Sequence, residues 1–227
     1  MPEPKKDDFQ RPDEWVDQDP YNVRGKPTHK AAEELLAEDV ELQAPETREE
    51  GTFTSEQTRL LEEEGYQIYT LTGESIATLK AKGFKFWSTW HEQNPQFETL
   101  QSRVGQVAIK TDPDEFFIPD SNNKTLDKQL EMVEEQNKAL SQRISGVKAI
   151  LGEAADYIEL AFQNNELFGE KYDYNYTRTQ TPTVGSHVAT VGDFNPDNGL
   201  SVNYWHRAHG HDFVWASPLV VPTSGTK

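Results

Sequence analysis

The sequence predicts an α+β fold, with a single domain over residues 52–222. Helices should pack on a small mixed sheet, and the C-terminal third should be antiparallel and rich in hairpins. Two observations support this class: helix caps and helical apolar spacing recur as far as Gly146, and strand and turn patterns dominate after it. The 227-residue chain is long enough to bury a core.

An acidic tail should precede the domain. Residues 1–51 hold 15 acidic and 7 basic residues and contribute −8 of the formal net charge of −17. Six prolines interrupt the segment, and aliphatic residues are scarce before Leu35. Such a segment cannot bury enough apolar surface to offset its ordering entropy, so we expect it to be disordered. Residues 223–227 should form a flexible C-terminus.

A short amphipathic helix near residues 29–43 is the exception within the tail. Thr28 can cap it, and its apolar residues gather near one face. A helix this short is marginal in water. It either folds into the groove of a protein partner, forms transiently, or docks on its own domain.

Helices and strands should alternate from Phe53 onward. Thr54 or Ser55 caps a first helix that Gly65 ends, and Gly83 ends a second. Aromatic and β-branched residues mark the strands between them. The expected elements are a helix through residues 61–64, a strand at 66–71, a helix at 74–82, a strand or buried aromatic strip at 84–90, and strands at 105–110 and 115–118.

The clearest helix should follow Thr125, its N-cap, with Asp127 near the positive helix end and Gly146 just past the C-terminus. Its apolar residues keep helical spacing, but Gln136 and Asn137 interrupt the stripe. Sustained heptads are therefore absent, and the pattern favours a surface helix that covers a sheet over a coiled coil.

Strands should fill the C-terminal third. Residues 147–151 form a short apolar run, and Ile158, Leu160 and Phe162 alternate as on one face of a strand. A turn at residues 164–165 should lead into a returning strand over residues 167–179, and further hairpins follow.

Composition excludes several classes of function. Acidic residues outnumber basic ones 39 to 22 and the isoelectric point is near 4.7, which argues against binding nucleic acid or an anionic membrane. The absence of cysteine excludes disulfides, thiolate nucleophiles, cysteine zinc sites and iron–sulfur ligation. No apolar run approaches the roughly 18 residues of a membrane helix, so we expect a cytoplasmic protein. The sequence does not indicate an oligomeric state.

Residues 193–199 are one candidate site. Asp193, Asn195 and Asp197 match the start of the oxygen-ligand pattern of calcium loops, and the stretch resembles the GDFNGDG-type loop of calcium-binding propeller repeats. Pro196 and Asn198 depart from the pattern. The alternative is a hairpin turn, in which Pro196 presets φ and the Asn198–Gly199 pair tolerates positive φ.

His206, His209 and His211 are a second candidate. A hairpin tip at residues 208–210 would bring His206 and His211 face to face, with His209 at the apex. With a carboxylate such as Asp193, these histidines would hold a divalent metal. The alternative is a set of exposed hairpin histidines beside aromatic strands.

A third candidate is the row of Tyr172, Tyr174 and Tyr176, followed by Arg178. Tyrosines at strand spacing on one face form either a binding surface, to which Trp205 would add, or a packed sheet face.

The motifs of nucleotide binding, serine hydrolysis and kinase chemistry are absent from the sequence. We therefore expect a non-catalytic binding or interaction protein that requires no cofactor. A metal-dependent enzyme with its site on the C-terminal hairpin is the alternative hypothesis.

Overall fold

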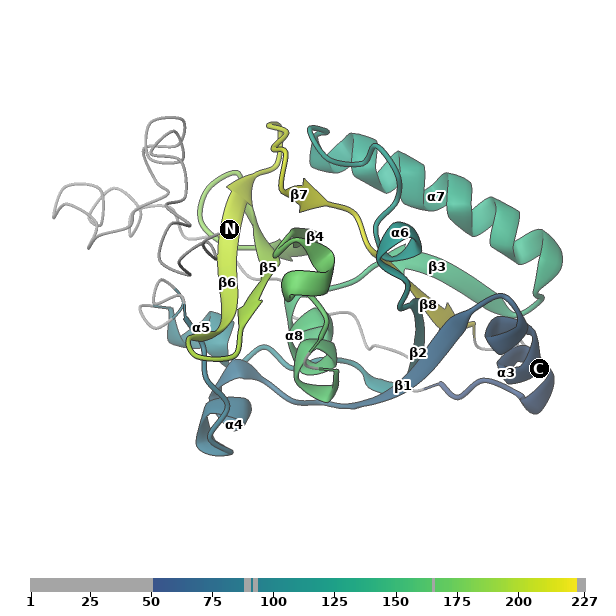
Figure 1. The fold of residues 1–227 in the computed structure, drawn as a ribbon, viewed down its shortest axis with the longest axis horizontal. Helices are drawn as coiled ribbons and strands as arrows, with labels where there is room; N and C mark the ends of the chain where they lie inside the picture. Colours follow the sequence, from purple (N-terminus) through teal and green to yellow (C-terminus); the bar gives the residue numbers. More distant parts are fainter. Residues whose placement is uncertain (1–50, 88–90, 92–93, 165, 224–227) are drawn as a thin grey trace, which may run out of the picture. The chain divides into compact units, whose positions relative to one another are not determined.

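The computed structural model describes residues 51–87, 91, 94–164 and 166–223, and it confirms the α+β class (Figure 1). Two four-stranded sheets, six α-helices and one 3-10 helix lie within these residues. The predicted tail, its helix at 29–43 and residues 224–227 lie outside them, with only Gly51 of the tail described. None of the helices in the described ranges is both long and apolar enough to cross a membrane.

The elements follow one another along the chain as α3 (Ser55–Glu63), β1 (Tyr66–Thr72), α4 (Ile76–Ala81), α5 (Pro95–Glu98), β2 (Val104–Lys110), α6 (Pro113–Phe116), α7 (Leu126–Arg143), β3 (Val147–Leu151), α8 (Ala154–Gln163), η2 (Glu170–Tyr172), β4 (Tyr176–Pro182), β5 (His187–Asn195), β6 (Gly199–His206), β7 (Val214–Trp215) and β8 (Pro218–Pro222).

Local capping explains why the predicted helices form where expected. Thr54 and Gln57 exchange side-chain and backbone hydrogen bonds at the start of α3. Thr125 accepts from the Lys128 backbone N–H at the start of α7. The predicted strands β1, β2 and β3 are also confirmed.

The first sheet has the order β1-β2-β8-β3 and is antiparallel throughout. Each of its faces contributes to an apolar cluster. Tyr69 and Leu71 of β1 pack into the core shared with α8, whereas Ile68 faces the cluster formed with α3 and α7. The last strand, β8, thus returns from the C-terminal third to complete the first sheet.

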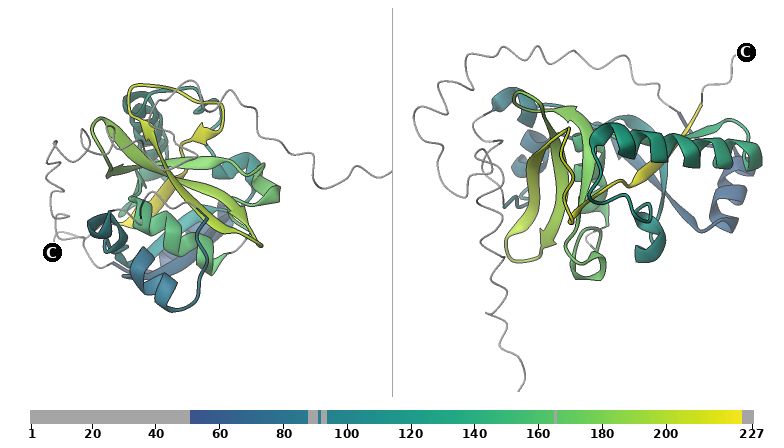
Figure 2. Two further views of the ribbon diagram at one scale, coloured as in Figure 1. Left: turned by 90° about the vertical axis from the view of Figure 1, so that its left-hand side faces the viewer. Right: turned by 90° about the horizontal axis from the view of Figure 1, so that it is seen from above.

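The second sheet has the order β6-β5-β4-β7, and only the β4–β7 pair is parallel. Figure 2 (left) shows its strands in front. Ala189, Val191 and Val202 on one face join the core shared with α8. The opposite face is mixed: Val188 and Trp205 lie beside polar side chains that are also largely buried, Tyr176, Arg178, Thr190 and Ser201.

Helix α8 lies between the two sheets (Figure 1) and corrects the predicted strand over Ile158, Leu160 and Phe162. Residues from Ala154 to Ala161 are all buried. Because a sheet covers the helix on each side, most of its residues are apolar, and part of that pattern imitates strand alternation. The two buried acidic residues of the helix are bonded: Asp156 pairs with Arg103, and Glu159 accepts from the Thr72 hydroxyl.

One other predicted strand in the first half, at 115–118, is wrong, and a second, at 84–90, is not seen in its described part. Residues 115 and 116 are the end of α6, which begins with Pro113 and which Asp112 caps by accepting from the Asp114 N–H; Phe117 is its C-cap. Residues 84–90 are predicted to form a strand or a buried aromatic strip; in the described part, residues 84–87, there is only an isolated bridge from Phe86 to Leu200, and Phe84 and Trp87 are exposed.

Candidate functional site

The predicted hairpin with its tip at residues 208–210 is wrong. Strand β6 ends at His206, and the chain continues to β7, where Val214 pairs with Tyr176 of β4 instead of with β6. The His211 ring therefore packs on Trp205, with ring centroids 4.5 Å apart. His206 instead stacks on His209 at 4.4 Å.

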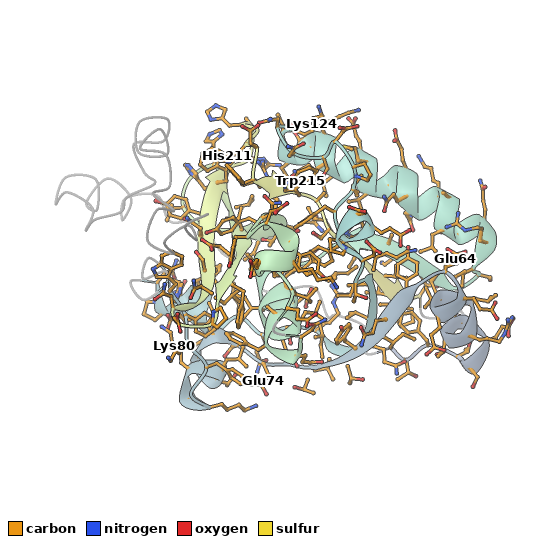
Figure 3. The ribbon with its side chains drawn as sticks, viewed as in Figure 1. Glu64, Glu74, Lys80, Lys124, His211 and Trp215 are labelled. Atoms are coloured by element: carbon orange, nitrogen blue, oxygen red, sulfur yellow. The ribbon has the colours of Figure 1, made fainter. Side chains whose placement is uncertain are left out.

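His187 joins this group because it pairs directly with His206 in the β5–β6 register, with ring centroids 5.1 Å apart. We call His187, His206, His209 and His211 the histidine corner. Figure 3 shows His211 at the same end of the molecule as Trp215 and Lys124, near the start of α7.

Backbone hydrogen bonds set the tautomers of two rings in the histidine corner, His206 and His211. The Ala208 N–H donates to His206 Nδ1 at 3.1 Å, and the Phe213 N–H donates to His211 Nδ1 at 3.2 Å. Each neutral ring therefore carries its proton on Nε2, which makes that nitrogen a donor and unsuited to hold a metal or to act as a base. No three His, Asp or Glu side chains in the described ranges converge as a metal would require.

Arg178 holds the segment at residues 207–213 through hydrogen bonds to its backbone. It is not part of an exposed binding surface. Its side chain is fully buried, and its guanidinium donates to the carbonyls of His206, Arg207 and His209. Burial lowers the pKa of Arg178 to about 10. The backbone N–H of Leu126 binds the segment from the α7 side, by donating to the Arg207 carbonyl.

The candidate calcium loop is a hairpin turn. Asn195 Oδ1 accepts from the backbone N–H groups of Asp197 and Asn198, and Gly199 has a φ of +95°. Asp193 is buried, and its Oδ2 lies 3.1 Å from the Tyr176 hydroxyl, whereas Asp197 is exposed. The predicted oxygen ligands therefore do not converge.

The tyrosine row also does not form. Tyr172 ends the 3-10 helix and is buried, with its hydroxyl donating to the Thr111 carbonyl. Tyr174 has a φ of +53°, which breaks the strand spacing. Tyr176 lies in β4 and is buried, as is Trp205 in β6.

An open cleft of about 510 Å³, which sequence reasoning missed, lies where α8 ends beside the β5–β6 turn. We call it the aromatic cleft. Its lining residues are Gly83, Phe84, Lys85, Phe162, Gln163, Phe194, Pro196 and Gly199. The Phe84 and Phe162 rings lie 4.6 Å apart, and those of Phe162 and Phe194 5.6 Å apart.

The backbone at the mouth of the aromatic cleft is held in place. Leu200 donates to the Lys85 carbonyl at 3.1 Å and accepts from the Trp87 N–H at 2.9 Å. Gly199 permits this approach, because a Cβ there would lie 2.1 Å from the Lys85 carbonyl oxygen. In the sequence, the aromatic residues directly after Gly83 were the available signal, but their partners lie far along the chain.

No protein-family model, curated protein or solved structure matches the chain.

Proposed function

We propose that the chain is a non-catalytic binding protein and that its aromatic cleft receives an apolar group of the ligand. One observation carries the proposal: three phenylalanine rings from distant segments meet at an open cleft, while Phe84 stays 39% exposed. Apolar surface left in water is covered favourably by a ligand, and pockets of roughly 300–1,000 Å³ are typical of binding sites.

The chemistry of the histidine corner supports a binding protein over a metal-dependent enzyme. Both His206 and His211 commit their Nδ1 lone pairs to backbone N–H groups. A catalytic metal or base would require a lone pair directed at the substrate side. A protein partner bound through residues 29–43 stays a prediction.

A titration with benzyl alcohol tests the proposal. This uncharged aromatic probe should shift the amide NMR signals of Lys85, Gln163 and Gly199 at millimolar concentration, because small ligands in open clefts bind weakly. The F84A variant should lose these shifts.

Phe213 supplies the matched control, because it is 37% exposed but lies between His211 and β7, outside the cleft lining. The F213A variant should bind benzyl alcohol like the wild type. Shifts spread over the whole surface, or equal weakening by F84A and F213A, would contradict the proposal.

A further inference from the structure

We propose that the aromatic cleft binds the C-terminus of a partner polypeptide that ends in an aromatic residue, with the terminal carboxylate held by the Lys85 ammonium group. This inference rests on the proposed function and specifies its ligand. Four features of the cleft support it: its charge, the state of Lys85, the acceptor on Gln163 and its size.

The charge of the cleft contrasts with that of the chain. The protein holds 39 acidic and 22 basic residues, yet none of the eight residues that line the cleft is acidic. Lys85 is the single charged residue among them. An anionic group can therefore enter without meeting a carboxylate in the lining, and it meets one cation there.

Lys85 differs from its neighbouring lysines. Lys80 forms an ion pair with Glu98, and Lys82 forms one with Glu74. Lys85 forms no ion pair with any residue in the described ranges, and its Nζ lies 3.5 Å from the backbone carbonyl of Asp197. Its ammonium group thus has donors for a ligand carboxylate, while its backbone is fixed by Leu200.

Gln163 adds a polar group of the opposite kind. Its Nε2 donates to the Thr70 carbonyl at 2.8 Å and to Glu159 Oε1 at 3.1 Å, which orients the amide. Both donors of the amide are used, so its Oε1 acceptor remains available to an N–H of the ligand. A peptide offers such an N–H on its terminal residue, beside the carboxylate.

The size of the cleft favours a polypeptide over a free aromatic acid. A terminal phenylalanine has only twelve non-hydrogen atoms, and covalently bonded atoms take up less space than the same number of water molecules. The cleft holds about 510 Å³, which leaves room for part of the preceding residue. The ring would lie against Phe84 and Phe162, edge to face or offset.

Three probes test the proposal on the full chain by NMR titration: the peptide acetyl-Gly-Ser-Gly-Phe with a free carboxylate, the same peptide with a C-terminal amide, and N-acetylphenylalanine. We expect the acid peptide to bind about threefold more tightly than its amide, the usual strength of an exposed ion pair. We expect N-acetylphenylalanine to bind more weakly than the acid peptide, because it lacks the preceding residues.

Substitutions assign the difference to Lys85. K85Q should remove the preference for acid over amide, as should high salt, since the pair is exposed. K148Q, which changes an exposed lysine on β3, should keep the preference. F84A should weaken both peptides alike, because it removes the apolar contact.

Each part can fail separately. Equal binding of acid and amide peptides at the cleft would overturn the carboxylate assignment and leave the binding function standing. N-acetylphenylalanine as tight as the acid peptide would overturn the polypeptide assignment. Failure of all three probes and of benzyl alcohol to shift the cleft signals would overturn the proposed function itself.

Discussion

The two ends of β6 are built in different ways. At its start, the turn from Asn195 to Gly199 contains its own acceptor, Asn195 Oδ1, which binds two backbone N–H groups, although the next residue, Leu200, also bonds to the backbone of Lys85 and Trp87. At its end, the segment at residues 207–213 is held from a distance. Arg178 binds carbonyls 28 to 31 residues further along the chain, and Leu126 binds the carbonyl of Arg207.

The difference shows which conformations local chemistry can specify. The β5–β6 turn needs an asparagine, a proline and a glycine in order, and the sequence displays them. The conformation of residues 207–213 depends on the buried guanidinium of Arg178 and on the start of α7. The residues of the segment itself do not indicate either contact. The aromatic cleft lies at the first end and the histidine corner at the second.

The largest effect should come from glycine substitutions at the two ends. In G199A, the new Cβ would meet the Lys85 carbonyl oxygen at 2.1 Å, at a φ of +95° that side chains disfavour. In G210A, it would meet the Asn123 carbonyl carbon at 2.3 Å. We expect each to lower the free energy of unfolding by about 3 kcal/mol or more, measured with urea.

G83A is the control for these variants. Gly83 has a φ of +90°, but a Cβ there would meet no atom within 4 Å. It should therefore show only the backbone penalty, about 1–2 kcal/mol. If G199A were no less stable than G83A, the close approach of Lys85 to the turn would be disproved.

R178M should have the next largest effect. It removes the buried guanidinium that donates to three backbone carbonyls. We expect this loss to lower the free energy of unfolding by about 3 kcal/mol. Burial disfavours the charged guanidinium and lowers its pKa to about 10. The variant no longer buries this cation, which offsets part of the loss. R59M, at an exposed arginine of α3, should leave the melting temperature almost unchanged.

NMR should locate the effect of R178M in residues 206–213 and leave the β5–β6 turn unshifted. A variant as stable as the wild type, or changes spread equally over both ends of β6, would show that Arg178 is not the anchor.

N195A should have a smaller effect, about 1 kcal/mol, because the two N–H groups that lose their acceptor lie in exposed residues and can bind water. N198A is the matched control: it removes a neighbouring exposed amide while keeping both N–H bonds to Asn195. Thermal melting that separates N195A from N198A would confirm the local origin of the turn, and equal melting would refute it.

The smallest effect should be a loss of stability on mild acidification. Burial lowers the pKa of His211, and nearby Arg178 adds to this while Asp212 opposes it. Since the native ring resists protonation, the unfolded chain binds the proton first, and stability falls as the pH drops below about 6.5. Above that pH, His211 should contribute no pH dependence.

H211N tests this pH dependence, because an asparagine oxygen can replace Nδ1 as the acceptor for the Phe213 N–H. Its urea midpoint should change less than that of the wild type between pH 7 and pH 5.5. Glu64, whose pKa the Arg143 side chain lowers, should lose its contribution only below its ordinary value of 4.5. An unchanged pH profile in H211N would show that His211 does not cause the loss of stability in mild acid.

Several elements were predictable because their signals are local. Thr54 and Thr125 lie at the helix starts they cap, and the turn at Asn195 contains its own acceptor. The alternation typical of strands predicted side-chain positions less well. It assigned the tyrosine row to one face, but the positive φ of Tyr174 ends that regularity.

The candidate sites show the same limit. The sequence placed His206 and His211 opposite each other, which required β6 to pair with the strand that follows it. Strand β7 pairs with β4 instead. The aromatic cleft depends on Phe84, Phe162 and Phe194, and no local spacing relates these three positions.

The sequence by itself determined the α+β class, the capped helices α3 and α7, and the β5–β6 turn, because each depends on interactions within a few residues. Only the tertiary structure decided that residues 154–163 form a helix between two sheets, that Arg178 holds the end of β6, and that three phenylalanines meet in a cleft. The physical reason is that burial on two sides and bonds between distant segments depend on how the strands pair, which local propensity does not specify.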